Sequence, residues 1–171
     1  MPRYIALLRG VSPVNAKMPA LCASFEAAGF TNVTTLQSSG NVAFDAPRRS
    51  EATLVRQAEA AMAGTLGRSF KTFIRSQAQL RAMLDADPFQ AFDLPKGAKR
   101  VVTFLDAAPT PPPALPITKA EARILALQGR EAYTAYVPVP GSPVFMVLIK
   151  KTFGDATTTR TWDTLHRCAT A

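Results

Sequence analysis

The stretch FGDATTTRTWDT, residues 153–164, combines several hydroxyl groups with a guanidinium and the one tryptophan of the chain. Thr158, Thr159 and Arg160 could bind an anion, because hydroxyl, backbone N–H and guanidinium groups all donate hydrogen bonds to oxygen. Trp162 could stack on a base or a sugar. The same residue types also cap helices and fill cores. The stretch therefore predicts a binding site, the start of a last helix with a buried tryptophan, or both.

A second polar cluster is expected near the N-terminus of the first predicted helix. The strand predicted at residues 3–10 ends there, and the hairpin strand 40–45 would lie beside it in a ferredoxin-like sheet. The residues expected at this rim are Arg9, Asn15, Lys17, Ser39 and Asn41. Unsatisfied N–H groups and the helix dipole favour an anion, and a guanidinium can hold two of its oxygens. The alternative is that the Ser and Asn side chains serve the turns and that Arg9 pairs with an acidic neighbour.

Catalytic and metal-binding chemistry has little support in the sequence. No GxGxxG, P-loop or GxSxG pattern is present, and no Cys–His pairing indicates a thiol nucleophile. Asp163 and His166 stand three positions apart and could transfer protons, although a surface pair is the ordinary interpretation. The single histidine and the distant Cys22 and Cys168 lack metal-ligand spacing. No metal or cofactor is expected, and enzymatic activity is left open.

The composition indicates a folded cytoplasmic protein. Of its 171 residues, 47% are hydrophobic and 19% are charged, which suits a buried core. No apolar run reaches the roughly 18 residues that a membrane helix needs, and nothing suggests secretion or disulfides. The net charge of +8 is compatible with nucleic acid, but the basic residues are scattered, and a solvated surface explains the charge about as well. A small anionic ligand is therefore the favoured partner, nucleic acid is weakly supported, no membrane partner is expected, and the oligomeric state is not predicted.

The first half of the chain predicts the order β-α-β-β-α-β. Apolar runs and alternation indicate strands at 3–10, 32–37, 40–45 and 69–75. A helix is predicted over 18–30, ending near Gly29, and Ser50 can cap a second helix that Gly67 ends. This order is typical of a ferredoxin-like fold.

The second half predicts β-α-β-β-α after a short helix that Ser76 and Gln79 can cap. Its strands are expected at 99–106, 131–138 and 143–151. The proline-rich segment 107–116 is predicted to be a polyproline-type connector. Thr118 and Glu121 form a capping-box pattern that predicts a helix through Leu127. The fold class is therefore α+β, with two ferredoxin-like halves, 1–75 and 76–171, of mainly antiparallel sheets backed by helices and packed together.

Three motifs in this order resemble the bacterial domain-of-unknown-function 1697 family. They are YIALLRGVSPVNAKMPAL, GFTNVTTLQSSGNVAF and FGDATTTRTWDTL. The residues that match the family are Arg9, Gly10, Asn15, Lys17, Met18, Ser39, Gly40, Asn41, Thr158, Thr159, Arg160, Trp162 and Thr164. The resemblance implies two ferredoxin-like halves and no assigned activity.

The chain departs from the family pattern at two places. The family's Asn-Val-Gly-Gly loop reads Ser-Pro-Val-Asn-Ala over 12–16, which is stiffer and lacks glycines that could cradle a phosphate. Its Asn-Trp-Asn reads Thr-Trp-Asp over 161–163, and the added carboxylate weakens a pure anion site. We expect a protein that binds a phosphate-bearing or other anionic ligand, such as a nucleotide, a sugar phosphate or nucleic acid. An enzyme of an anionic substrate and an interaction module without a ligand are the alternatives.

Overall fold

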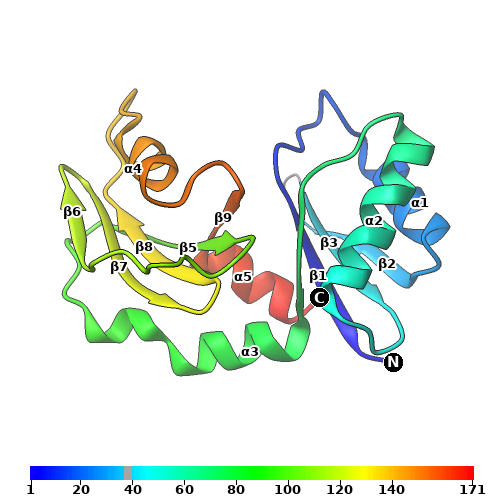
Figure 1. The fold of residues 1–171 in the computed structure, drawn as a ribbon, viewed down its shortest axis with the longest axis horizontal. Coiled ribbons are helices and arrows are strands. Elements are labelled where there is room, and N and C mark those ends of the chain that lie inside the picture. The colour runs from blue at the N-terminus through cyan, green and yellow to red at the C-terminus, as the bar shows by residue number, and fades with distance from the viewer. Residues whose placement is uncertain (37–39) are drawn as a thin grey trace. The chain divides into compact units, whose positions relative to one another are not determined.

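The computed structural model describes residues 1–36 and 40–171, and the chain in it divides into two compact units (Figure 1). Unit 1 comprises residues 1–85 and 166–171, and unit 2 comprises residues 86–165. Each unit holds one antiparallel sheet with helices against it, which confirms the predicted α+β class. None of the described helices is long and apolar enough to cross a membrane.

Unit 1 has the predicted β-α-β-β-α-β order and the sheet order β2-β3-β1-β4. The third strand therefore lies beside the first, as expected for a ferredoxin-like sheet, with Leu7 opposite Asn41. The elements are β1 (Arg3–Leu8), α1 (Met18–Ala27), β2 (Thr31–Thr35), β3 (Asn41–Asp45), α2 (Glu51–Leu66), β4 (Thr72–Ser76) and α3 (Gln77–Ala86). The expected hairpin positions Ser38 and Ser39 lie outside the described residues, and Gly40 has a φ of 89°.

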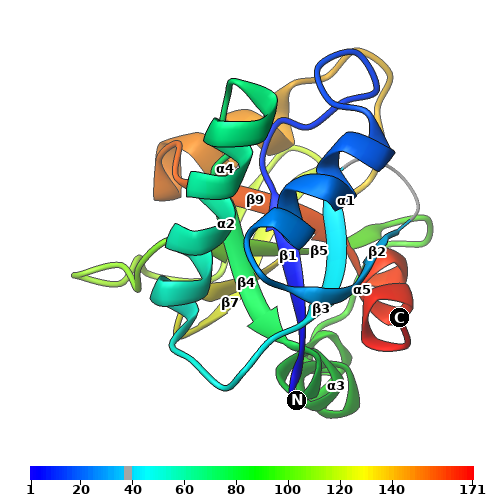
Figure 2. The ribbon, with the colours of Figure 1, turned by 90° about the vertical axis from the view of Figure 1, so that its right-hand side faces the viewer.

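Helices α1 and α2 cover one face of this sheet and close the core of unit 1 (Figure 2). Side chains alternate along a strand, so Tyr4, Ala6 and Leu8 of β1 all point into this core. Phe30 and Phe44 stack there at a centroid distance of 4.3 Å. Burial of this apolar surface is the main contribution to the stability of unit 1, and it holds the strands in place.

Local capping signals of unit 1 are used as the sequence predicts. The Ser50 hydroxyl accepts from the Thr53 N–H at 3.2 Å, and Gly67 ends α2 with a φ of 73°. At α3, the Ser76 N–H donates to Gln79 Oε1 at 2.7 Å, while the Gln79 N–H donates to Ser76 Oγ at 3.1 Å. This reciprocal pair is a capping box.

Unit 2 holds a five-stranded sheet in the order β6-β7-β8-β5-β9. Its elements are the 3-10 helix η1 (Pro88–Ala91), β5 (Lys99–Leu105), β6 (Ile117–Lys119), β7 (Ala122–Gln128), β8 (Glu131–Tyr136), α4 (Val144–Phe153) and β9 (Thr157–Thr161). The helix α5 (Trp162–Ala169) begins in unit 2 and ends in unit 1. No helix or strand forms between β5 and β6, as predicted for the proline-rich connector.

Several elements of unit 2 differ from the sequence prediction, among them the following two. The segment 122–128 is a strand and not a helix. It pairs along its length with β8, and this pairing outweighs the helix propensity of its residues. The segment 144–153 is a helix and not a strand. Its Phe145, Leu148 and Ile149, spaced three and four positions apart, all face the sheet. The turn that the sequence predicts between these two strands, VPGSP at residues 139–143, is instead part of the loop into this helix.

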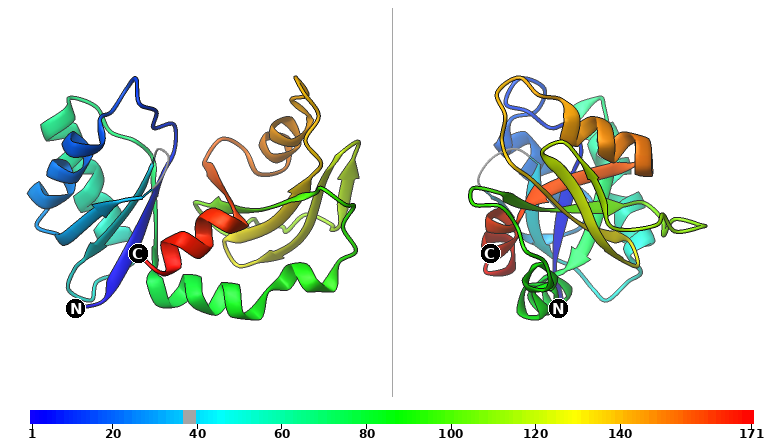
Figure 3. Two further views of the ribbon diagram at one scale, coloured as in Figure 1. Left: turned by 180° about the vertical axis from the view of Figure 1, so that it is seen from behind. Right: turned by 90° about the vertical axis from the view of Figure 1, so that its left-hand side faces the viewer.

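Helix α4 covers one face of the five-stranded sheet, where it packs on Val101, Ala122 and Ile124 (Figure 3). The opposite face carries an aromatic cluster. Phe89 of η1 contacts Tyr133 of β8 and Trp162 of α5 edge to face, at 5.5 Å and 5.0 Å between centroids. Burial raises the pKa of Tyr133 to about 12, with the nearby Glu131 carboxylate as a second cause. This face is therefore filled by side chains.

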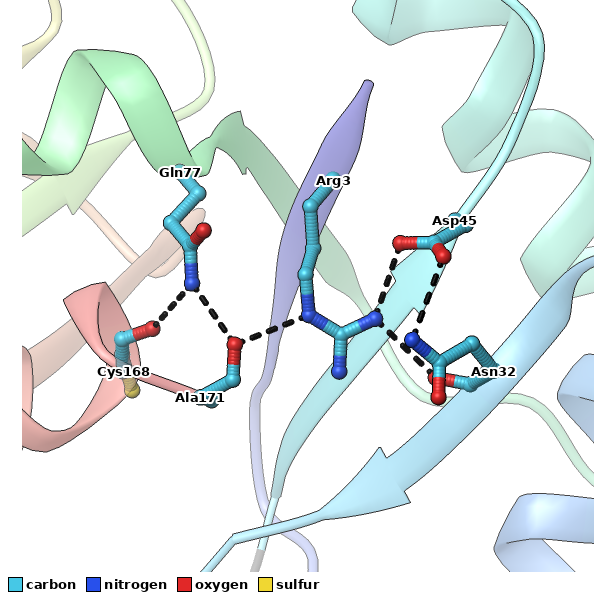
Figure 4. A network of polar contacts seen from close by, with 6 residues as sticks. All are labelled: Arg3, Asn32, Asp45, Gln77, Cys168 and Ala171. Carbon is cyan, nitrogen blue, oxygen red and sulfur yellow. Dashed lines mark hydrogen bonds and ion pairs between the residues drawn. The ribbon is translucent and has the colours of Figure 1, made fainter. Parts of the chain in front are cut away.

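A network of hydrogen bonds joins the first strand of unit 1 to the last residue of the chain (Figure 4). Arg3 donates to the Asp45 carboxylate at 2.8 Å and to the backbone oxygen of Ala171 at 2.9 Å. The Gln77 amide donates to the same Ala171 oxygen at 2.8 Å, and Asn32 donates to Asp45 at 3.2 Å. Arg3 of β1 and Gln77 of α3 thus hold the last residue of the chain, and Asp45 and Asn32 hold Arg3 in place.

We predict that Asp45→Asn destabilises the chain at neutral pH and not in acid. The hydrogen bond from Arg3 is the main cause that lowers the pKa of Asp45 below its ordinary value of 3.8. Since the folded pKa is the lower one, the stabilisation is complete above the ordinary value and is lost as the pH falls through the folded pKa. The pair is partly exposed, so we expect a loss of about 1 kcal/mol.

The measurement is urea unfolding of wild type and variant at about pH 7 and about pH 3. Asp85→Asn removes an exposed carboxylate of unit 1 and is the control. An equal difference between wild type and D45N at both pH values would contradict the assignment.

Candidate functional site

A groove of about 470 Å³ opens on the α4 side of the five-stranded sheet of unit 2. Sites for small organic ligands are typically clefts of roughly 300 to 1,000 Å³ with mostly apolar walls and a few polar groups. The groove has this character. It is lined by Val101, Glu121, Tyr136, Pro138, Val139, Pro140, Ser142, Phe145, Met146, Thr159 and Thr161.

Strand β9 contributes two hydroxyl groups to the groove. It pairs antiparallel with β5, with Thr161 opposite Val101 and Thr159 opposite Thr103. Successive side chains of a strand point to opposite faces, so Thr159 and Thr161 reach the α4 side while Thr158 and Arg160 reach the other. Only alternate residues of the TTTRT segment can therefore serve this groove.

An aromatic pair forms one wall of the groove. Tyr136 ends β8, and Phe145 begins α4; their rings stack with centroids 4.6 Å apart and an interplanar angle of 24°. Val139 and Met146 add apolar surface that is about half exposed, at 49% and 50%. Exposed apolar side chains around a concave surface are typical of a binding groove.

Glu121 supplies the one charge among the described residues that line the groove. It follows Ala120, whose φ of 49° makes the turn between β6 and β7. The Ser142 hydroxyl donates to the Glu121 carboxylate, and this bond is the main cause that lowers the pKa of Glu121. The Glu121 carbonyl also accepts from the Val137 N–H at 3.1 Å. The carboxylate is thus held in place and ionised at neutral pH.

The loop 138–143 is stiff for its length. Three of its six residues are prolines, each of which restricts φ, and Ser142 N–H donates to the Val139 carbonyl at 3.0 Å. Ser142 is bound to the Glu121 carboxylate at one end of the loop, and the Val137 N–H is bound to the Glu121 carbonyl at the other, so both ends are fixed. The wall of the groove is accordingly formed before a ligand arrives, which lowers the entropic cost of binding.

The last helix begins within the FGDATTTRTWDT stretch, as the sequence predicts, but only at Trp162, after the threonines. Residues Thr157–Thr161 are the edge strand β9, which suits their β-branched side chains. The cap of α5 is Thr161, whose Oγ1 accepts from the Thr164 N–H at 3.3 Å. The run of threonines before the tryptophan was the signal that could have predicted this strand.

The other predicted residues of this stretch lie away from the groove. Arg160 donates to Thr158 Oγ1 at 2.7 Å and to the Thr159 carbonyl at 2.8 Å, within its own strand. Trp162 is only 4% exposed and packs on Phe89, which is the core role that the sequence left as an alternative to ligand stacking. Asp163 and His166 are exposed and do not line the groove.

The predicted rim of unit 1 comes together in part. The Leu8 N–H donates to the Gly40 carbonyl at 2.8 Å, so the end of β1 and the hairpin before Asn41 meet as expected. The Arg9 N–H donates to the Lys71 carbonyl at 2.9 Å, which brings in a basic residue that the sequence analysis missed. Asn41 itself is 1% exposed within the sheet. Ser39 lies outside the described residues.

Asn15 and Lys17 serve the loop before α1. Asn15 accepts from the Ser12 N–H and donates to the Gly10 carbonyl, both at 2.8 Å, so its amide closes the loop. The Lys17 ammonium donates to the Pro13 carbonyl at 3.1 Å and stays exposed. For Asn15 the turn role that the sequence left open is therefore the one observed.

Sequence reasoning missed Glu121, Tyr136 and Ser142 as site residues. The sequence pattern predicts Glu121 in a helix cap and residues 139–143 in a hairpin between two strands. With those elements, nothing in the sequence would place the three side chains close together. A turn at Ala120-Glu121 and a helix after Pro143 are the two features that bring them together.

The chain belongs to the DUF1697 family, described as a protein of unknown function, whose sequence model matches residues 1–133. The first two motifs fall within this match and the third lies beyond it. A solved structure of a conserved bacterial protein from Streptococcus pneumoniae is similar over 99% of this chain and 97% of its own, with 19% identity and a TM-score of 0.72. At that identity the similarity shows the fold alone. No curated protein sequence matches the chain significantly.

We predict that Thr161→Ala lowers the free energy of unfolding by about 1 kcal/mol, because the N-terminus of α5 loses its side-chain cap. Thr161→Ser keeps the hydroxyl and should restore most of the loss. Chemical denaturation measures both variants. If serine were as destabilising as alanine, the methyl group and not the hydroxyl would be the important part of this residue.

Proposed function

We propose that this protein binds a small organic ligand in the groove of unit 2. The observation that carries the proposal is the convergence of the Tyr136–Phe145 ring pair with the Glu121 carboxylate and the Thr159 hydroxyl around one hollow. Each group comes from a different element of the fold. Core packing alone would not require a carboxylate and open apolar surface at the same place.

A variant that fills the groove tests this proposal. Val139→Trp adds a large side chain at a half-exposed groove residue, and Val147→Trp makes the same change at an exposed residue of α4 that does not line it. The three proteins are screened against a mixed library of small aromatic amines, alcohols and acids. We expect compounds that bind wild type and V147W with similar affinity to bind V139W about tenfold or more weakly.

Binding would be followed by amide chemical shifts in a two-dimensional NMR titration, with attention to Thr159, Thr161 and Tyr136. Both variants should have melting temperatures close to that of wild type, since both positions are exposed. Shifts that map elsewhere, or binders that V139W retains, would rule out the groove as the site.

A second candidate function is binding of a phosphate-bearing or other anionic ligand at the rim of unit 1. Arg9, Lys17 and Lys71 are exposed there on adjoining segments. Helix α1 begins beside them with no side-chain cap and no acidic residue in its first turn. Unit 1 also carries 11 of the 20 Lys and Arg residues and only five of the 12 Asp and Glu residues. The charge balance supports an anion at this rim and not in the groove, whose one described charge is negative.

We predict that the double variant Arg9→Ala with Lys71→Ala weakens binding of inorganic pyrophosphate about tenfold, since two donors to the anion are lost. Arg48→Ala with Arg49→Ala removes two exposed charges elsewhere in unit 1 and is the control. Isothermal titration at low and moderate salt gives the affinities.

Equal losses in both double variants, or binding that vanishes at moderate salt, would indicate general charge attraction. A short single-stranded oligonucleotide serves as the second probe. If it alone binds, with a steep salt dependence, nucleic acid association replaces the small anion as the interpretation.

A further inference from the structure

We infer that the groove of unit 2 selects an organic cation, a protonated amine carried on a flat ring. The inference rests on the proposed function, because it names the ligand class of the same groove. It differs from the anionic ligand considered for unit 1 in sign of charge and in site. Three features of the groove carry it: its charge, its ring faces and its acceptor oxygens.

The charge of the groove is negative at neutral pH. Among the described lining residues Glu121 is acidic, and none is Lys, Arg or His. The carboxylate is ionised at neutral pH, and the bond from Ser142 lowers its pKa further. A carboxylate accepts several hydrogen bonds at once, so the hydroxyl of Ser142 leaves acceptor capacity for a ligand ammonium.

The ring faces favour the same class of ligand. Tyr136 and Phe145 stack on one another, and Tyr136 lies in the wall beside Glu121. The face of an aromatic ring is the negative part of its quadrupole and attracts a cation. A wall that combines such rings with a carboxylate therefore favours an ammonium group over a neutral hydroxyl, and disfavours a second carboxylate.

The hydroxyl oxygens complete the set of acceptors. Thr159 and Thr161 face the groove from β9, and a threonine oxygen has two lone pairs. Thr161 already accepts from the Thr164 N–H, so Thr159 is the better placed of the two to receive an N–H of the ligand. An ammonium group brings three N–H donors and no acceptor, which suits a site of acceptors.

Positive groups nearby oppose the selection. Lys99 stands opposite Tyr136 in the β5–β8 ladder, but it is exposed and does not line the groove. The N-terminus of α4 lies beside Ser142, and a helix N-terminus carries roughly half an elementary charge. Arg123 lines an adjoining hollow of about 280 Å³ that shares Glu121 and Tyr136, but its guanidinium donates to the Asp93 carbonyl at 2.8 Å. The full charge of Glu121, inside the groove itself, outweighs the partial charge of the helix end.

The test compares benzylamine, benzyl alcohol and benzoate, which share one ring and differ in charge. We expect benzylamine to bind the wild type about tenfold more tightly than benzyl alcohol, and benzoate not to bind in the groove. NMR titration of each probe against the whole chain gives the affinity and the place of binding from the same spectra.

The variant Glu121→Gln removes the charge and keeps an oxygen that can accept from Ser142. It should reduce the preference for benzylamine over benzyl alcohol to about twofold or less. Asp155→Asn removes an exposed carboxylate that does not line the groove and should leave the preference unchanged.

Three outcomes separate the two proposals. If the probes bind in the groove with equal affinity, the cation inference fails and the proposed function stands. If no probe and no other aromatic compound binds there, both fail. If E121Q lowers the melting temperature but leaves the preference for benzylamine unchanged, Glu121 only anchors the loop at Ser142, and the inference is overturned.

Discussion

The alternation of side chains along β9 is the constraint on which the candidate site depends. Pairing with β5 fixes the register, so Thr159 and Thr161 must point to the α4 side while Thr158 and Arg160 point away. A shift of one residue would place the guanidinium in the groove, where its charge would cancel that of Glu121. Such a shift is costly because Trp162, which follows β9 directly, would lose its buried place against Phe89.

The groove exists because three local structures meet at one end of the sheet. The turn at Ala120 presents Glu121, the proline-rich loop 138–143 presents Ser142, and α4 presents Phe145. The hydrogen bond between Ser142 and Glu121 fastens the loop to the turn. A site made in this way is preformed, which is what binding of a small ligand with few contacts requires.

The distribution of charge gives the two units different chemistry. Unit 1 holds most of the surplus positive charge, and the groove of unit 2 holds a carboxylate. The FGDATTTRTWDT stretch illustrates the consequence. Its Arg160 bonds within its own strand, its Trp162 fills the aromatic core, and two of its threonines border the groove. Family membership gives no activity against which to compare these sites, so each rests on its own chemistry.

The sequence by itself determined what depends on near neighbours: the element order of unit 1, the cap at Ser50, and the capping box of Ser76 and Gln79. Only the tertiary structure decided that 122–128 is a strand, that 144–153 is a helix and that Glu121, Tyr136 and Thr159 converge. Helix-forming residues joined β7 because a place between β6 and β8 buries Ala122 and Ile124 in the core of unit 2, and β-branched residues joined α4 because the helix buries three apolar side chains on the sheet. Such gains come from contacts between distant parts of the chain, and local propensity, which amounts to less than about 1 kcal/mol per residue, does not outweigh them.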